Sequence, residues 1–179
     1  MNYQDVLKFW FEELTPKQWW VKDPELDATI AKRFGETLNR ASQCELFAWR
    51  DTPDGRLAEI IVLDQFSRNM YRDQAQAFAA DPLAVALAQA AVQTGDDMKI
   101  PRERRPFLYM PYMHSESLTI HDEAVRLFTE LGIEQNLDYE YKHKAIIDRF
   151  GRYPHRNQIL GRESTPEEIE FLKGPGSSF

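Results

Sequence analysis

The chain has 179 residues, of which 42% are hydrophobic and 12% aromatic, and its formal net charge is −7. This composition is typical of a folded globular protein with a sizeable core and excludes an intrinsically disordered chain. The acidic balance argues against a nucleic-acid-binding surface. The single cysteine, Cys44, excludes an intramolecular disulfide and a multi-cysteine zinc site, and we interpret it as a small buried residue.

The first residues, MNYQDVLKFWFEEL, are acidic and aromatic, whereas a secretory signal has a basic region followed by an apolar one. We find no stretch that approaches the roughly 18 apolar residues of a transmembrane helix. The sequence therefore predicts a cytoplasmic protein without a membrane partner.

Helix starts recur along the chain as an N-cap residue followed by proline. The cap side chain accepts a hydrogen bond from an unpaired amide, and proline at the first helical position has no amide to satisfy. Thr15 with Gln18 and Thr165 with Glu168 also have capping-box spacing. The five starts are Thr15-Pro16, Asp23-Pro24, Thr52-Pro53, Asp81-Pro82 and Thr165-Pro166.

Between these starts the apolar residues recur with a helical period, and no alternating β-branched run is present. We therefore predict an all-α fold of about nine helices, joined by short connections into antiparallel pairs. No glycine- or serine-rich linker divides the chain, so a single domain is predicted over 1–179, with a flexible tail at 174–179. The predicted helices are 3–13, 24–41, 53–71, 82–94, 102–116, 118–131, 137–150, 154–160 and 166–173.

The segment LAEIIVLDQFSRNMYRD, residues 57–73, is apolar on nearly every side of the predicted helix, which favours a central position. Asp64, Arg68 and Arg72 are spaced four apart and continue one face. Because buried charges are costly unless paired, two interpretations remain open. These residues either form a structural Asp–Arg pair between helices or line one wall of a polar cleft.

The segment PFLYMPYMHSESL, residues 106–118, contains two prolines five residues apart, so its helix should start, kink or restart. His114 lies on the apolar side of this helix, as a hydrogen-bonded core residue or a catalyst. Glu116 falls on the opposite side, which argues against His114 and Glu116 as a simple metal-binding motif.

The segment YEYKHKAIIDRFGRYPHRNQILGR ends one predicted helix and begins another. His143 shares the core face of the first helix. Gly151 fits a left-handed C-cap and Pro154 fits the first position of the next helix. Arg152 and Arg156 can either bind an anion at that helix N-terminus or pair with internal carboxylates such as Asp64 and Asp148. His155, Arg156 and Asn157 occupy its first turn.

Three motifs, LDQFSRNMYRD, PFLYMPYMHSESL and RFGRYPHRNQILGRESTPEEIEFL, resemble the bacterial family known as domain of unknown function 924. The resemblance spans nearly the whole chain, with Ser67 standing where the family usually has proline. It implies an all-helical, tetratricopeptide-like architecture and no established activity. His121 and Asp122 match no family motif, and we interpret them as a solvated helix pair. Matching polar positions are Asp64, Gln65, Arg68, Asn69, His114, Glu116, His143, Arg149, Arg152, His155, Arg156 and Asn157.

We predict a site that binds a small anionic ligand, a phosphate or carboxylate compound, because arginine forms planar, bidentate hydrogen bonds with such groups. Histidine is the side chain that transfers protons near neutral pH. No cofactor or metal is predicted. The ligand-binding residues would be Asp64, Arg68, Asn69, Glu116, Arg152, Arg156 and Asn157, with His114, His143 and His155 as catalytic residues.

Two other functions stay open. A tetratricopeptide-like module would bind a protein partner, with the aromatic N-terminal segment as a contact surface or, alternatively, as core. A metal-dependent hydrolase would use the histidines with Glu116 and Asp64, but no pair of these residues has the usual ligand spacing. The aromatic residues concerned are Phe9, Trp10, Phe11, Trp19 and Trp20.

Overall fold

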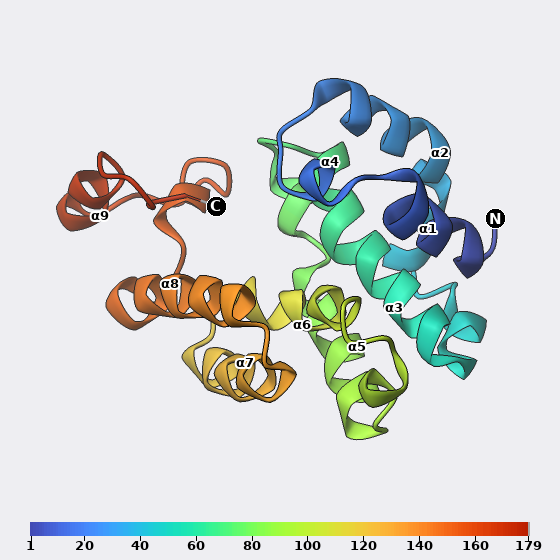
Figure 1. Ribbon diagram of the computed structural model, residues 1–179. Helices are drawn as coiled ribbons and strands as arrows, with labels where there is room; N and C mark the ends of the chain where they lie inside the picture. Colours follow the sequence, from blue (N-terminus) through green and yellow to red (C-terminus); the bar gives the residue numbers. More distant parts are fainter. Residues whose placement is uncertain (179) are drawn as a thin grey trace. The chain divides into compact units, whose positions relative to one another are not determined.

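A computed structural model describes residues 1–178, and over these residues the chain is all-helical with no β-strand, which confirms the predicted fold class (Figure 1). Phe179, the last residue of the predicted tail, lies outside the described residues. The chain groups into two compact units. The first comprises Met1–Arg72 with Gln76–Pro111, and the second comprises Asp73–Ala75 with the chain from Tyr112 onward. A single domain over 1–179 stays a prediction.

A long helical rod lies at the centre of the first unit. It runs without a break from Pro53 to Met70, as predicted, and changes to a π-helical turn over Val62–Phe66. Helix α1 packs against its first part, and α2 and α5 pack against the π-helical turn. Most of its apolar side chains are inaccessible to solvent. The helices of this unit are α1 (Tyr3–Lys8), α2 (Pro24–Ser42), α3 (Pro53–Ile61), α4 (Ser67–Met70), α5 (Asp81–Gln93) and α6 (Arg105–Met113, as far as Pro111).

The aromatic N-terminal segment belongs mainly to the core of the first unit. Phe9 and Trp10 are buried, and Phe107 contacts the rings of Trp10 and Trp19. Trp20 is 60% exposed and stacks on Phe107. Core packing therefore accounts for the inner residues of this segment, while Trp20 presents an aromatic face to solvent.

Cys44 is exposed, so its prediction as a buried residue is wrong. It follows the C-terminus of α2 and has a φ of 59°, in the left-handed region. The chain turns away from the helix there, and the side chain leaves the apolar face that its neighbour Ala41 occupies.

By length and composition alone, the helical segment Ala75–Gln93 is apolar enough to cross a membrane. The sequence-based expectation of no such stretch overlooked it, because Asp81 and Pro82 interrupt the apolar run. One such helix is weak evidence of a membrane span, because core helices of soluble proteins and signal sequences pass the same test. The absence of a membrane partner stays a prediction.

The second unit is built on a pair of long helices that lie side by side, α7 (Leu118–Leu131) and α8 (Glu134–Phe150) (Figure 1). They end at Gly132 and Gly151, which both have a φ of 68°, as predicted from the glycine C-caps. The short helix α9 (Pro166–Phe171) begins at the predicted capping box of Thr165.

Two predicted helices are shorter in the structure. Helix α6 covers 105–113 of the predicted 102–116, since Ser117 already caps the next helix. The helix predicted at 154–160 is a single 3₁₀ turn, Pro154–Arg156. The chain beyond this turn bends back on itself, because the amide of Arg162 donates to the carbonyl of Asn157.

Candidate functional site

The predicted site residues fall into two groups. Three of them, Asp64, Arg68 and Asn69, belong to the first unit. The other seven belong to the second unit: His114, Glu116, His143, Arg152, His155, Arg156 and Asn157.

In the first unit, Asp64 lies within the π-helical turn and its side chain is fully buried. A π-helical turn is often found at functional sites. Arg68, one turn further on, lies 3.2 Å from the carboxylate of Asp64 and makes a bidentate pair with Asp81 at 2.8 and 2.9 Å. Gln65 also donates to Asp64, at 2.6 Å. The rod is therefore tied to the start of α5 by one guanidinium shared between two carboxylates.

Asn69 takes part in a second tie, between α4 and α2. It donates to Asp27 at 2.8 Å, and Arg72 makes a bidentate pair with the same carboxylate at 2.7 and 2.8 Å. The pKa of Asp27 is lowered, because the hydrogen bonds from Arg72 and Asn69 outweigh the opposing effect of burial. These contacts match the structural interpretation of the Asp–Arg pattern in this segment.

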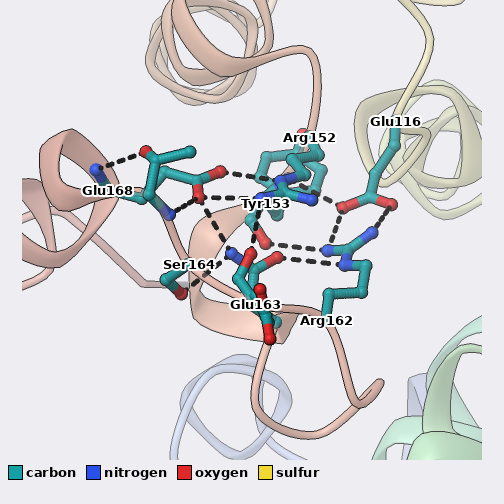
Figure 2. Close-up of polar contacts among 9 residues, drawn as sticks. Glu116, Arg152, Tyr153, Arg162, Glu163, Ser164 and Glu168 are labelled. Carbon is teal, nitrogen blue, oxygen red and sulfur yellow. Dashed lines mark hydrogen bonds and ion pairs between the residues drawn. The ribbon is translucent and has the colours of Figure 1, made fainter.

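In the second unit, the carboxylate of Glu168 accepts hydrogen bonds from three residues (Figure 2). Arg152 donates to it twice, at 2.7 and 2.8 Å, and Thr165 donates through its amide at 2.8 Å. Asn157 is a weaker donor at 3.3 Å. The Arg152 guanidinium lowers the pKa of Glu168 to about 2, and the carboxylate thereby caps α9 and fixes the segment after α8.

Glu116 occupies a similar position beside the turn that begins at Pro154 (Figure 2). Arg162 donates to it at 2.6 and 2.9 Å, and the amide of Tyr153 donates at 2.7 Å. Burial favours the neutral acid, but these donors prevail and lower the pKa of Glu116. An internal carboxylate, that of Glu116, therefore lies at the N-terminal end of this turn, where the sequence suggested a bound anion.

Arg152 pairs with Glu168 and not with Asp148, one of the internal carboxylates that the sequence offered as an alternative. Asp148 accepts a hydrogen bond from Lys144 at 2.7 Å, one turn earlier on α8. Arg152 lies beyond Gly151, where the chain has left the helix, so four-residue spacing no longer brings the two side chains together.

Replacing Glu168 by alanine should lower the free energy of unfolding by about 2 kcal/mol, because Arg152 then loses a nearly inaccessible partner and α9 loses its cap. Glu167→Ala is the matched control. Glu167 pairs with Arg149 across the same two segments, but both side chains are more than half exposed, so we expect a loss below about 1 kcal/mol. Urea unfolding measures both. Equal losses would contradict this assignment.

The four histidines of the chain all belong to the second unit, and three of them lie around Tyr153. The ring centroid of Tyr153 lies 5.6 Å from that of His155, 5.9 Å from His143 and 6.3 Å from His121. His114 adjoins this group, with its ring 6.3 Å from that of His143. We call Tyr153 and these four residues the histidine cluster.

Arg156 lies over the Tyr153 ring of the histidine cluster. Its guanidinium carbon lies 4.6 Å from the centre of the Tyr153 ring and it donates to the carbonyl of His114 at 3.0 Å. Arg156 is 6% exposed, whereas His114 and His155 are half-buried. The structure thus brings four predicted site residues together, His114, His143, His155 and Arg156.

Burial lowers the pKa of His143 to about 3, so its imidazole is neutral at physiological pH. Its Nδ1 lies 2.7 Å from the carbonyl oxygen of Tyr139. A carbonyl only accepts, so Nδ1 carries the proton and Nε2 carries the lone pair. This residue can accept a hydrogen bond but cannot serve as a proton donor near pH 7.

His121 was missed by sequence reasoning, which took it for a solvated residue. It is fully buried, with Nδ1 2.6 Å from Oε1 of Glu140. Glu140 and Tyr153 were also missed. The helical phase contained a signal, since His121, Ala124 and Phe128 share the buried face of α7. Asp122, the other member of the expected pair, is exposed and lies 3.4 Å from Lys144.

Over residues 1–178, no group of three or more His, Cys, Asp or Glu side chains has a geometry that could hold a metal ion. The histidine cluster is therefore built from ring contacts and hydrogen bonds. The hydrolase alternative has no ligand set in this part of the chain.

The fold and the two groups of polar residues describe an all-helical protein with a histidine-rich second unit. Residues 6–176 match the family described as bacterial protein of unknown function (DUF924), and the chain belongs to this family. Its structure is similar to that of a protein of unknown function from Agrobacterium tumefaciens. The two are 37% identical, with a TM-score of 0.92 over 96% of this chain and 97% of the other. No curated protein matches the sequence significantly.

Proposed function

We propose that the second unit binds a small carboxylate or phosphate compound at the histidine cluster, with Arg156 as its anion-binding residue. The observation that carries the proposal is the grouping of the four histidines of the chain: three lie around Tyr153, the fourth lies beside His143, and Arg156 lies over the Tyr153 ring. Histidines that served only solubility would be scattered over the surface. The wider cleft that would include Asp64, Arg68 and Asn69 stays a prediction.

The charges of the cluster support an anion as the ligand. Arg156 contributes a fixed positive charge, and His143 is a neutral hydrogen-bond acceptor. A guanidinium in a poorly hydrated position interacts strongly with an anion, because little water screens the charge. Of the three predicted arginines, Arg156 is the one that lies in the histidine cluster, over the ring of Tyr153, so it is the one we assign to the ligand.

The half-buried imidazoles of His114 and His155 are in contact with solvent, which a site that binds its ligand reversibly requires. His114 lies beside the buried His143 and His155 beside the buried Tyr153, so these two imidazoles are where a ligand from solvent would first meet the cluster. Histidine is suited to proton transfer near neutral pH, and these two residues would supply it if the ligand is also a substrate. Asn157 and Glu116 would support the site indirectly, through their bonds with Arg162.

Histidine labelled with ¹⁵N tests the proposal directly, because the only four imidazoles of the chain all lie in the cluster. Inorganic phosphate and benzoate are titrated separately, with sodium chloride at equal ionic strength as the control. We expect saturable shifts of the His114 and His155 resonances with at least one of the two probes, and none with chloride. Shifts that follow ionic strength alone would refute the site.

Two arginine variants make the test specific. Arg156→Gln should weaken binding of the responding probe by at least about 10-fold, since it removes the charge-assisted hydrogen bonds. Arg149→Gln is the control. It removes an exposed arginine of the same unit, which lies over the ring of Phe150 away from the cluster. Equal affinity in the two variants would show that Arg156 does not hold the anion.

A further inference from the structure

A chain of hydrogen bonds connects Glu140 to Tyr153 through His121. Oε1 of Glu140 lies 2.6 Å from Nδ1 of His121, and Nε2 of His121 lies 2.8 Å from the carbonyl oxygen of Ser115. The hydroxyl of Tyr153 lies 3.2 Å from the same Nε2 and donates to the carbonyl of Met113 at 2.5 Å. All three side chains are at most 1% exposed.

The two backbone carbonyls determine where the protons lie. The carbonyl of Ser115 only accepts, so Nε2 of His121 carries a proton. The carbonyl of Met113 only accepts as well, so the hydroxyl proton of Tyr153 points towards it. Tyr153 can then only accept from His121. The tautomer of His121 and the rotamer of the Tyr153 hydroxyl are both fixed.

One proton must also lie between Glu140 and His121, since otherwise two acceptor atoms would face each other at 2.6 Å. This proton belongs either to an imidazolium beside a carboxylate or to a carboxylic acid beside a neutral imidazole. The other oxygen of Glu140, Oε2, decides between these states. It is inaccessible to solvent and accepts no hydrogen bond. A buried carboxylate oxygen without a donor is costly, whereas the carbonyl oxygen of a neutral acid is much less so.

We propose that Glu140 is a protonated carboxylic acid at neutral pH, and that it positions Tyr153 by donating to His121 in its Nε2–H tautomer. Burial, the dominant influence, raises the pKa of Glu140, while His121 and Lys144 act in the opposite direction. Lys144 is the charged group one turn further on α8. Its ammonium lies 2.7 Å from Asp148 and 3.4 Å from Asp122, so two carboxylates already balance it.

A neutral Glu140 has a consequence for the histidine cluster, which rests on the proposed function. Because a neutral Glu140 adds no negative charge beside the cluster, it does not repel an anion that binds to Arg156. Glu140 and His121 act through Tyr153, whose ring lies under the guanidinium, and they are positioning residues.

The imidazole ¹⁵N shifts of His121 in the intact wild-type chain test the protonation state without any ligand. We expect one protonated nitrogen, Nε2, and one acceptor nitrogen, Nδ1, at pH 7. Infrared difference spectra of wild type against Glu140→Gln should show the carbonyl stretch of a protonated acid. Two protonated nitrogens on His121, or a carboxylate band in the difference spectrum, would overturn the proposal.

The variants Glu140→Gln and Glu140→Ala test the positioning role. The amide of glutamine can donate to Nδ1 as the acid does, so Glu140→Gln should keep the His121 tautomer and bind the responding probe, phosphate or benzoate, within about 3-fold of wild type. Glu140→Ala removes the donor and should weaken binding by at least about 10-fold. Asp148→Asn, an exposed change on the same helix, is the control.

The two proposals fail in different ways. A wild-type chain that binds neither probe refutes the anion site, while the ¹⁵N pattern of His121 still decides the state of Glu140. Equal binding by Glu140→Gln and Glu140→Ala, with binding intact in wild type, refutes the positioning role alone.

Discussion

Replacing Arg68 by alanine should lower the free energy of unfolding by about 3–5 kcal/mol, because the change removes the cation shared by two carboxylates. Asp64 is fully buried and Asp81 is nearly so. Without Arg68, these two carboxylates would lose the cation that they share. Removing one partner of a buried ion pair is strongly destabilising, because it leaves a buried charge without its counterion. Replacing both partners by apolar residues has a much smaller effect on stability.

Urea unfolding followed by circular dichroism measures the loss in Arg68→Ala. Arg40→Ala is the control in the same unit, since Arg40 lies 3.6 Å from Glu45 and both side chains are about half exposed, and it should cost less than about 1 kcal/mol. Adding Asp64→Asn to Arg68→Ala should recover part of the stability. An Arg68→Ala chain as stable as wild type would contradict a structural role for this cluster.

Acidification from pH 6.5 to 4.5 should destabilise the protein by about 2–3 kcal/mol through His143 alone, at up to ~1.4 kcal/mol per pH unit. The pKa of this imidazole is lowered to about 3 in the folded protein, from 6.5 in the unfolded chain. The unfolded chain therefore binds the extra proton first throughout this window, and stability falls as the pH falls. Burial is the main cause, and the positive charge of Arg156, which also faces His143, disfavours its protonation further.

The variant His143→Gln isolates this effect, because glutamine has no titrating group and can still donate to the carbonyl of Tyr139. Its stability should change less than that of wild type between pH 6.5 and 4.5, as measured by urea unfolding at a series of pH values. Glu168 acts in a separate window. Its pKa is about 2, against 4.5 in the unfolded chain, so its contribution is complete above pH 4.5 and is lost below it. An unchanged pH slope in His143→Gln would refute a buried, neutral imidazole.

The helices could be predicted from the sequence because their signals are local. A cap residue followed by proline opens α2, α3 and α9, and glycine in the left-handed region ends α7 and α8. The rod Pro53–Met70 could be predicted because apolar residues cover nearly every side of its helix, despite the charged residues within it. Its π-helical turn was not, since one extra residue per turn leaves no local pattern that distinguishes it from an ordinary helix.

The partners of the arginines could not be predicted, because they lie far away in the sequence. Arg162 pairs with Glu116, 46 residues earlier, and Arg68 with Asp81, 13 residues later. An acidic chain offers many carboxylates to each cation, and only packing selects among them. His143 lies on a core face, as its helical position predicts. His121 is also buried, and its helical position predicts this, whereas its charged neighbour Asp122 suggests an exposed pair.

Gly151 allows the chain to leave α8 in a direction that gives two adjacent residues different partners. Arg152 reaches Glu168, and Tyr153 reaches His121 and Glu116. A single residue inserted before Pro154 would displace one or both of these residues from their partners, so the connection should tolerate a change in length poorly. Members of the family should therefore vary in residue type here more readily than in residue number. A one-residue insertion should damage α9 and the histidine cluster together, which neither Arg152 nor Tyr153 substitutions would do singly.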